Sequence, residues 1–189
     1  GPGLARDPGR GRGAAFGVSR VCPVEDGGGA VEPSPAPIRT VDDAARYLDG
    51  LIDRERLPDA RRRRMSLEPI RAVLDVLGHP ERALSVVHVA GTKGKGSTCP
   101  FGEALSRALG ERTGVFTSPH LESWTERFRI DGREVDGERL AAAVERVRPA
   151  VDRLRAARDG EAPSFFDATT AAAFLLFAEA RVDRVWLEV

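Results

Sequence analysis

Apolar side chains recur every three or four positions from residue 41 onward, which is the spacing of amphipathic helices. The first such stretch predicts a helix over 41–52, with Thr40 as its N-cap. The next predicts a helix over 67–77, which Ser66 caps and Gly78 ends. We therefore expect the ordered part of the chain to open with two short helices.

Runs of β-branched and apolar residues predict strands farther along the chain. Residues 84–90 have the composition of a buried parallel strand, and residues 114–117 and 182–189 share this character. Residues 126–130 alternate between apolar and polar, and Asp131-Gly132 directly after them predicts a turn.

Three further helices are predicted around these strands. One runs over 97–109, and another over about 136–158 with a kink at Pro149. A strongly apolar helix covers 165–180, with Asp167 as its expected cap. Strands that alternate with helices predict an α/β fold, namely a P-loop-type parallel sheet flanked by helices. Such a sheet binds its ligand at the C-terminal edge of its strands.

The N-terminal stretch has a different composition. Residues 1–37 are dominated by Gly, Pro, Arg and Ala, and bury too little apolar surface to offset the entropy lost on ordering. They are predicted to form a disordered tail before one domain over 38–189, and an organelle transit peptide is the alternative. The four arginines at 61–64 are interpreted as a solvated surface segment rather than as an anion site.

Composition and charge exclude several classes of protein. The 189 residues are 41% hydrophobic and 31% charged, and 29 basic side chains balance 29 acidic ones. The chain is therefore no charged disordered tail, and has no bulk attraction to nucleic acid or to anionic membranes. No signal peptide is expected, because the first residues lack an apolar segment, and no run of about 18 apolar residues predicts a membrane span. Cys22 and Cys99 are too few and too distant for a disulfide framework or a metal cluster, so a reducing, cytoplasmic location is expected.

The basic residues are divided unequally, because Lys93 and Lys95 are the only lysines and the other 27 are arginines. Both lysines lie in the glycine-rich segment 91–98, between a predicted strand and a predicted helix. Glycines let backbone N–H groups turn toward an anion, and lysine supplies a compact charge where arginine is bulky. The strict P-loop pattern is not met, because Val89 stands at its first glycine position and Gly96 follows Lys95. The segment is nevertheless interpreted as a phosphate cradle.

Several stretches resemble the folylpolyglutamate synthases, a branch of the Mur ligase superfamily whose members are often also dihydrofolate synthases. The glycine-rich segment resembles the superfamily's ATP loop, and Ser-Pro-His-Leu followed by Glu-Arg-Phe-Arg-Ile is similar to this branch. The resemblance extends over residues 40–189. The matching stretches, in chain order, are 47–68, 89–98, 116–121, 126–132, 164–170 and 186–189.

The resemblance implies an ATP-dependent, amide-forming ligase. In such an enzyme the γ-phosphate of ATP passes to a carboxylate of folate or dihydropteroate, and the amino group of L-glutamate attacks the resulting acyl phosphate. Lys95 would be the catalytic residue that neutralises the β- and γ-phosphates. The residues expected to bind ATP are Gly91, Thr92, Lys93, Gly94, Lys95, Gly96, Ser97 and Thr98.

The resemblance also makes Ser118 and Glu188 ligands of Mg²⁺. A hydroxyl and a carboxylate at neighbouring strand ends suit a hard cation that keeps several waters. Without the resemblance, Ser118 is an ordinary Ser-Pro turn and Glu188 a solvent-facing strand residue. Among the histidines, we expect His120 to structure its loop, His88 to be packed in the core, and His79 to lie at a helix end.

The folate side of the site is also inferred from the resemblance. Apolar and aromatic side chains could form a slot for a flat pterin ring, although core packing is the alternative for the phenylalanines. Asp167 stands where a glutamate is expected, and Pro100 is unusual but lies in the first turn of its helix. The residues expected to contact folate are Met65, Ser66, Leu67, Glu68, Phe165, Phe166 and Asp167.

The family continues beyond the terminal glutamate with a second glycine-rich segment, a metal-ligand histidine and a smaller C-terminal domain. The chain is therefore expected to be the N-terminal part of a synthase that is monomeric when complete. We expect it to expose apolar surface and not to complete ligation alone. A Mur ligase of peptidoglycan synthesis and a non-catalytic nucleotide-binding module are the alternatives. Addition of the first glutamate to dihydropteroate and later additions to reduced folates both fit the sequence.

Overall fold

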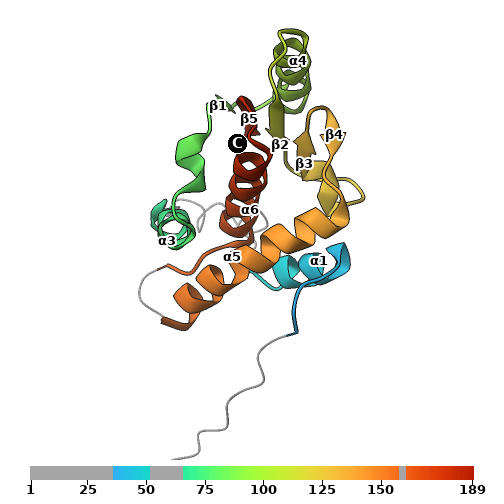
Figure 1. Cartoon of the computed structure of the whole chain (residues 1–189). Coiled ribbons are helices and arrows are strands. Elements are labelled where there is room, and N and C mark those ends of the chain that lie inside the picture. Colours follow the sequence, from blue (N-terminus) through green and yellow to red (C-terminus); the bar gives the residue numbers. More distant parts are fainter. Residues whose placement is uncertain (1–35, 52–65, 158–160) are drawn as a thin grey trace, which may run out of the picture. The chain divides into compact units, whose positions relative to one another are not determined.

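The computed structural model describes residues 36–51, 66–157 and 161–189 (Figure 1). Residues 1–35 of the predicted tail, the arginines at 61–64 and Met65 lie outside the described residues. The helices are α1 (Val41–Asp49), α3 (Glu68–Leu77), α4 (Lys95–Ala108), α5 (Gly137–Ala157) and α6 (Phe165–Ala180), with 3₁₀ turns η1 (Pro80–Ala83) and η2 (Trp124–Arg127). The strands are β1 (Val86–Val89), β2 (Thr113–Phe116), β3 (Phe128–Ile130), β4 (Arg133–Glu134) and β5 (Arg184–Glu188).

The strands of the described residues form one sheet in the order β1-β5-β2-β3-β4. β5 lies between β1 and β2 and pairs with both in parallel, so that Glu188 lies beside Val89. β3 and β4 extend the sheet in the antiparallel direction. The α/β class is confirmed, but the sheet is mostly rather than wholly parallel. The Asp131-Gly132 turn, whose two φ angles are positive, returns β4 beside β3 as a hairpin, and β3 is itself antiparallel to β2 after the loop 117–127.

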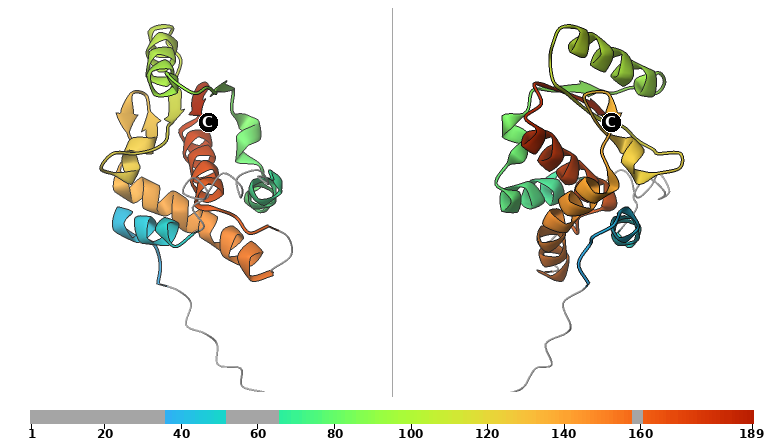
Figure 2. Two further views of the ribbon diagram at one scale, coloured as in Figure 1. Left: turned by 180° about the vertical axis from the view of Figure 1, so that it is seen from behind. Right: turned by 45° about the vertical axis from the view of Figure 1, so that its right-hand side comes forward.

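Helices α4 and α6 cover opposite faces of the parallel strands, as the right-hand view of Figure 2 shows. Side chains alternate along β5, since successive residues of a strand point to opposite faces. Val185 is buried on the side where neighbouring Gly114 faces Phe177 of α6. Trp186 points the other way and packs on Gly102 of α4. Two different helical layers therefore meet the same strand.

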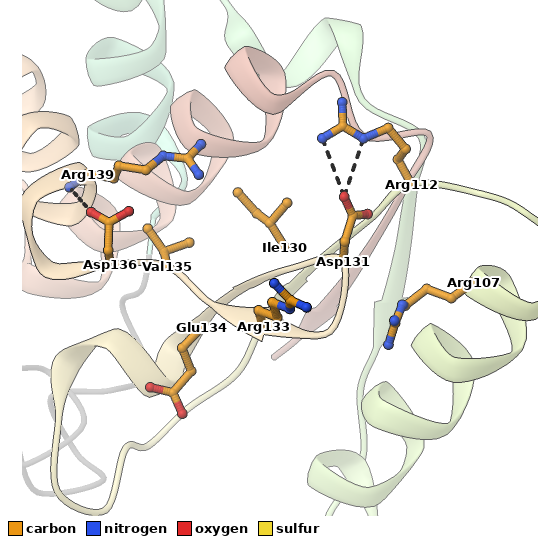
Figure 3. Close-up of a pocket in the computed structure, with 9 residues that line it drawn as sticks. All are labelled: Arg107, Arg112, Ile130, Asp131, Arg133, Glu134, Val135, Asp136 and Arg139. Atoms are coloured by element: carbon orange, nitrogen blue, oxygen red, sulfur yellow. Dashed lines mark hydrogen bonds and ion pairs between the residues drawn. The ribbon is translucent and has the colours of Figure 1, made fainter.

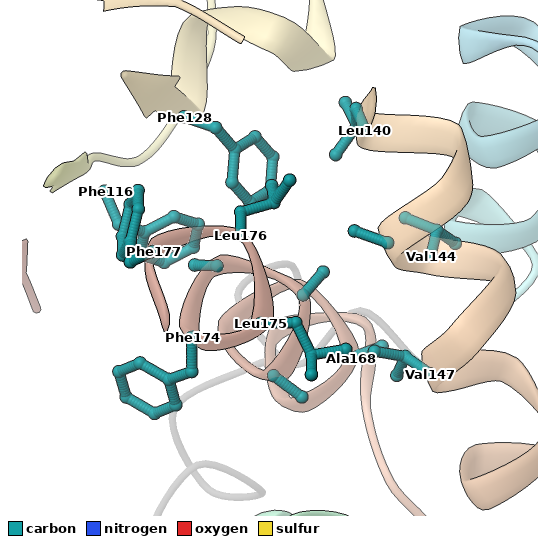
Figure 4. Close-up of a cluster of buried hydrophobic side chains, with 14 of the residues drawn as sticks. Phe116, Phe128, Leu140, Val144, Val147, Ala168, Phe174, Leu175, Leu176 and Phe177 are labelled. Atoms are coloured by element: carbon teal, nitrogen blue, oxygen red, sulfur yellow. The ribbon is translucent and has the colours of Figure 1, made fainter. Parts of the chain in front are cut away.

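The hydrophobic core lies on the α6 side of the sheet (Figure 4). Phe116 and Phe128 bring their ring centroids to 5.3 Å, and Phe177 packs beside them. Helix α5 crosses α6 and contributes Leu140 and Val144 to the same cluster. Helices α1 and α3 pack on α5 and α6, which closes this side.

Capping boxes begin α1 and α6, and two helix starts differ from the prediction. Thr40 caps α1 as predicted. The cap of α6 is Ser164, and Asp167 at its third position bonds back to the Ser164 N–H, so the prediction of Asp167 as the cap was wrong. The cap position of α3 is Leu67, one residue after the predicted Ser66, whose hydroxyl instead accepts a bond from the Glu68 N–H.

The predicted burial of the first strand was wrong. β1 lies at the edge of the sheet, and His88, predicted to be packed in the core, is exposed. The pattern of β-branched residues identifies a strand but not its position in the sheet. The helix after the glycine-rich loop begins at Lys95, two residues before the predicted Ser97. Among the described helices, none is long and apolar enough to span a lipid bilayer.

Candidate nucleotide and metal site

The glycine-rich segment connects the end of β1 to the start of α4. Gly94 adopts a positive φ of 80° as the N-cap of α4, a conformation that side-chain-bearing residues rarely adopt. This turn aims the N-terminus of a 14-residue helix at the space beyond the C-terminal edge of the sheet. The first N–H groups of a helix have no partner within the helix, so they are available to an anion.

The two lysines of this loop have different surroundings. The Lys95 ammonium donates to the Gly91 carbonyl at 2.7 Å, so its side chain crosses the loop and is partly buried. The Thr98 hydroxyl donates to the Gly94 carbonyl at 2.8 Å and braces the same turn. Lys93 is exposed on the loop. The geometry thus separates one inward lysine from one outward lysine.

Three predicted site residues from distant parts of the chain meet beside this loop. Glu188 ends β5 and is only 7% exposed. It therefore does not face solvent, as was expected of it when the resemblance is set aside. Its Oε2 accepts a bond from the Ser118 N–H at 3.4 Å. A Cβ atom built on Gly96 would lie 3.9 Å from both carboxylate oxygens of Glu188. The carboxylate therefore lies between the first turn of α4 and the loop after β2.

The donor set at this point suits a hard cation. A Ser118 hydroxyl and a Glu188 carboxylate are oxygen ligands, and a cation held by two side chains completes its shell with water or phosphate oxygens. No group of three or more His, Cys, Asp or Glu side chains that could hold a metal occurs in the described part of the chain. Burial and the negative charge of Glu188 raise the pKa of the nearby Cys99 thiol to about 11, so this thiol stays protonated at neutral pH.

An aromatic cluster lies on the other side of the Ser118 loop. The rings of Trp124 and Phe165 are 6.0 Å apart, and the guanidinium of Arg127 lies 4.9 Å from the Trp124 ring and 5.5 Å from the Phe165 ring. Arg127 Nε donates to His120 Nδ1 at 2.7 Å, in keeping with the predicted loop-structuring role of His120. Phe166 approaches Phe165 at 6.3 Å. This aromatic cluster joins the loop after β2 to the start of α6.

Sequence reasoning missed Trp124 and Arg127. Arg127 lies in the stretch 126–132 that carried the family resemblance, and Trp124 lies just before that stretch. The signal was the spacing of three residues between them. Three residues on a 3₁₀ turn bring two side chains to the same side, where a cation can cover an aromatic face.

The other predicted folate residues are engaged locally. The Asp167 carboxylate accepts bonds from the Ser164 N–H at 2.8 Å and the Ser164 hydroxyl at 2.6 Å. Glu68 pairs with Arg71 at 3.4 Å, and both Ser66 and Leu67 are exposed. Phe165 is buried in the aromatic cluster, while Phe166 is partly exposed. The described contacts thus bring Phe165 and Phe166 toward the Ser118 loop.

Glu126 holds that loop in shape. Its carboxylate accepts bonds from the backbone N–H groups of Leu121, Glu122 and Ser123 at 2.8, 2.8 and 2.6 Å. These bonds favour the ionised form and hold the pKa of Glu126 below its ordinary value. A carboxylate with three N–H donors fixes the path of the chain between Ser118 and η2.

A separate hollow of about 510 Å³ lies at the start of β2, away from this site (Figure 3). Arg112 and Asp131 form an ion pair at 3.4 Å on its wall. The site described above lies at the ends of β1, β2 and β5 instead. The hollow is lined by Arg107, Arg112, Ile130, Asp131, Arg133, Glu134, Val135, Asp136 and Arg139.

Comparison with known proteins finds relatives that are folylpolyglutamate synthases. No protein-family model matches the chain. It is 38% identical over 172 residues to the dihydrofolate synthase/folylpolyglutamate synthase of Mycobacterium tuberculosis, which covers 87% of this chain and 34% of that protein. The chain therefore spans about a third of the length of this curated relative.

Solved structures agree in fold. The M. tuberculosis folylpolyglutamate synthase complexed with ADP and AMPPCP superposes with a TM-score of 0.68 at 36% identity, covering 79% of this chain and 31% of that one. A bifunctional folylpolyglutamate synthase/dihydrofolate synthase with Mn, AMPPNP and L-glutamate bound gives a TM-score of 0.65 at 30% identity, covering 79% and 33%. The described residues thus have the fold of about a third of these proteins.

Proposed function

We propose that this chain, a homologue of part of the folylpolyglutamate synthases, supplies the nucleotide- and metal-binding part of a ligase that joins L-glutamate to a folate with ATP. The observation that carries the proposal is the meeting of Gly96, Ser118 and Glu188 beside the Lys95 loop. These residues come from three separate segments, and each has the chemistry that a metal-nucleotide complex requires.

The loop would receive the phosphates. The N-terminus of α4 presents N–H donors and partial positive charge, and Lys95 adds a full charge from within the loop. To contact a phosphate, the Lys95 ammonium must exchange its bond with the Gly91 carbonyl for one with a phosphate oxygen. Phosphoryl transfer needs mainly positioning and neutralised charge, which this loop can provide.

Ser118 and Glu188 would hold Mg²⁺ at the edge of the loop. When bound, the cation neutralises phosphate charge and orients the γ-phosphate. The buried Glu188 carboxylate is held in place by the Ser118 N–H, and the absence of a side chain at Gly96 leaves room in front of it. A larger residue at position 96 would occupy this space.

The reaction that fits this site proceeds through an acyl phosphate. A folate or dihydropteroate carboxylate attacks the γ-phosphorus and ADP leaves. The amino group of L-glutamate then attacks the acyl carbon, loses a proton and displaces inorganic phosphate. The aromatic cluster of Trp124, Phe165 and Phe166 would supply the flat faces against which a pterin ring stacks. We assign this work to a domain over 38–189, and propose that further polypeptide like that of the longer relatives is needed to complete ligation.

Nucleotide binding tests the loop assignment directly. Lys95→Ala is expected to weaken ATP binding by the 189-residue chain at least about tenfold, measured by calorimetry in the presence of Mg²⁺. The matched control is Lys93→Ala, which removes the exposed lysine of the same loop and should change the affinity less than about threefold. Equal effects of the two substitutions would contradict the assignment of Lys95, rather than Lys93, as the lysine that contacts the phosphates.

Metal binding tests the assignment of Glu188, and turnover tests whether further polypeptide is needed for ligation. Glu188→Gln should reduce Mn²⁺ binding in the presence of a nucleotide, measured by electron paramagnetic resonance, while Glu122→Gln on the neighbouring exposed loop should not. Glutamate-dependent phosphate release should be undetectable with the 189 residues alone. Turnover by these residues alone would show that no further polypeptide is needed.

A further inference from the structure

The hollow at the start of β2 is lined by arginines from four segments of the chain. Arg107 comes from the last turn of α4, Arg112 precedes β2, Arg133 belongs to β4, and Arg139 lies near the start of α5. Figure 3 shows the side chains of Arg107 and Arg139 entering the hollow from opposite sides. All four residues are exposed, so a dissolved molecule can reach them.

Two aspartates of the hollow are already engaged by groups of the chain itself. The Asp131 carboxylate accepts a bond from the Thr113 N–H at 2.8 Å and pairs with the Arg112 guanidinium at 3.4 Å. The Asp136 carboxylate accepts a bond from the backbone N–H of Arg139 at 2.8 Å. These aspartates therefore hold the start of β2 and the start of α5, and neutralise only Arg112.

The third acidic side chain of the hollow is also engaged elsewhere. The Glu134 carboxylate accepts a bond from the Thr125 hydroxyl at 3.1 Å. Among the described residues, the guanidinium groups of Arg107, Arg133 and Arg139 consequently form no ion pair with a carboxylate. A guanidinium has five N–H donors in a planar fork that matches the oxygens of a carboxylate or phosphate. Three such groups thus have donors available to an anion from solution.

Arg107 is placed by the shape of the neighbouring turn. A Cβ atom built on Gly132 would lie 2.1 Å from Arg107 Nη1, so the guanidinium occupies the space left by the missing side chain. Gly132 has a φ of 80°, and its N–H donates to the buried Glu103 carboxylate at 2.7 Å, which fixes the turn. The chain therefore positions a guanidinium here without an acidic partner.

A second hollow, of about 430 Å³ between α3 and η1, has compensated charges. Arg71 pairs with Glu68 at 3.4 Å, and Arg82 lies 3.9 Å from Glu81. Three acidic residues line it beside two arginines, whereas the hollow at the start of β2 has three acidic residues beside four arginines. The surplus of unpaired guanidinium groups is therefore a property of one hollow, and arginine-rich composition alone does not produce it.

We propose that the hollow at the start of β2 binds a small polyanion, a compound with two or more phosphate or carboxylate groups. More than one anionic group is required because the unpaired arginines stand on three different segments. The volume of about 510 Å³ is in the range of small-molecule sites, about 300–1,000 Å³. Buried Val135 and half-buried Ile130 supply an apolar wall for the body of the ligand.

This site is distinct from the candidate nucleotide site. The hollow lies at the start of β2, whereas Ser118 follows the other end of that strand. A ligand held by Arg107, Arg133 and Arg139 would bridge α4, the β3–β4 hairpin and α5, and would stabilise the folded chain by binding to it alone. The inference does not rest on ligase activity.

Nuclear magnetic resonance locates an anion on the 189-residue chain. Titration of the ¹⁵N-labelled chain with pyrophosphate, in the absence of Mg²⁺, should shift the amide signals of Gly132, Arg133 and Arg139 until they saturate. A parallel titration with citrate distinguishes carboxylates from phosphates, and NaCl at matched ionic strength measures charge screening. Saturation with either probe supports the proposal, and the probe that saturates identifies the anionic group.

Paired substitutions test which arginines bind the anion. Arg107→Gln combined with Arg139→Gln should weaken binding at the hollow at least about tenfold, because two charge-assisted contacts are lost. The matched control is Arg71→Gln combined with Arg82→Gln in the second hollow, which should change the affinity less than about twofold. All four side chains are exposed, so neither pair should prevent folding.

Several results would overturn the proposal. Shifts that NaCl reproduces would reflect charge screening, and shifts confined to residues 91–98, or none at all, would leave the hollow without a ligand. Unchanged affinity in the Arg107 and Arg139 variant would show that these arginines do not bind the anion. Lys95→Ala separates this site from the proposed function, since it should suppress pyrophosphate shifts at Gly94 and Gly96 but not at Gly132.

Discussion

Helices α4 and α6 flank the same sheet but differ sharply in burial. Twelve of the 16 residues of α6 are buried, including Phe177, Leu175 and Leu176. Only three of the 14 residues of α4 are buried, namely Cys99, Glu103 and Ser106. Part of the difference is in composition, because α6 is apolar almost throughout, whereas α4 carries only a few large apolar side chains, such as Phe101 and Leu105, and these are exposed. The rest arises because α5, α1 and α3 pack around α6, whereas no helix of the described residues has substantial contacts with α4.

The two sides therefore perform different tasks. The α6 side contains the hydrophobic core and should supply most of the stability of the described residues. The α4 side contributes the glycine-rich loop and the helix N-terminus that faces Glu188. Because few residues of α4 are buried, substitutions at the site on this side should cost less stability than substitutions in the core.

The largest expected effect tests whether stability lies on the α6 side. Phe177→Ala should lower the free energy of unfolding by about 3–5 kcal/mol, because it removes a fully buried ring and leaves a cavity. Phe101→Ala on α4 should change it by less than about 0.5 kcal/mol, because that ring is 81% exposed. Urea unfolding of the 189-residue chain measures both. Equal losses would mean that the two helices are equally covered.

The next effect concerns the contact between α4 and the sheet. Gly102→Ala should destabilise by about 1–3 kcal/mol, because the new methyl group would collide with the ring of Trp186, which lies 2.3 Å from the Cβ position. Gly96→Ala, in the first turn of the same helix, is the control. Its new Cβ would meet the Glu188 oxygens at 3.9 Å, so stability should stay within about 1 kcal/mol. A neutral Gly102→Ala would show that α4 is free to move away from the sheet.

The smallest effect concerns the loop that joins the two sides. Glu126 fixes this loop through three N–H donors, and its pKa in the folded chain is lowered from the ordinary 4.5. Below about pH 4.5 the unfolded chain takes up the proton first, so the stabilisation is present above that pH. It is lost as the pH falls through the lower pKa of the folded state.

Glu126→Gln should therefore flatten the dependence of Tm on pH below about pH 4.5. At neutral pH it should slightly increase hydrogen exchange of the loop amides. The control is Glu122→Gln. Glu122 is exposed and bonds to the Glu126 carboxylate through its backbone N–H, which the substitution keeps. An unchanged pH profile in Glu126→Gln would show that another carboxylate governs the acid limb.

Local patterns predicted most of the elements and their ends. The 3.6-residue periodicity located α1 and α3, and a long, strongly apolar stretch located α6. The Thr40 and Gly78 signals marked real helix ends. The Asp131-Gly132 turn was also predicted, because its conformation depends on the two residues themselves. These features rest on contacts within a few residues, which a sequence contains in full. The cap of α6 was misassigned because Ser164 and Asp167 both have capping side chains and three residues separate them.

The candidate site could be predicted only in part. The unusual pair of lysines and the glycines around them indicated a phosphate loop, and family resemblance indicated Ser118 and Glu188. Their meeting depends on β5 inserting between β1 and β2, which brings a residue near the end of the chain beside one seventy positions earlier. The Trp124 and Arg127 contacts with Phe165 likewise depend on how η2 docks on α6.

The sequence by itself determined most of the helices and strands and which family the chain resembles, and it predicts a phosphate loop at residues 91–98. Only the tertiary structure decided which apolar stripe is covered. It buried α6, exposed Phe101 and Leu105 on α4, and left His88 on an open edge strand. The physical reason is that periodicity reports the shape of one element, whereas burial depends on which other elements pack against it.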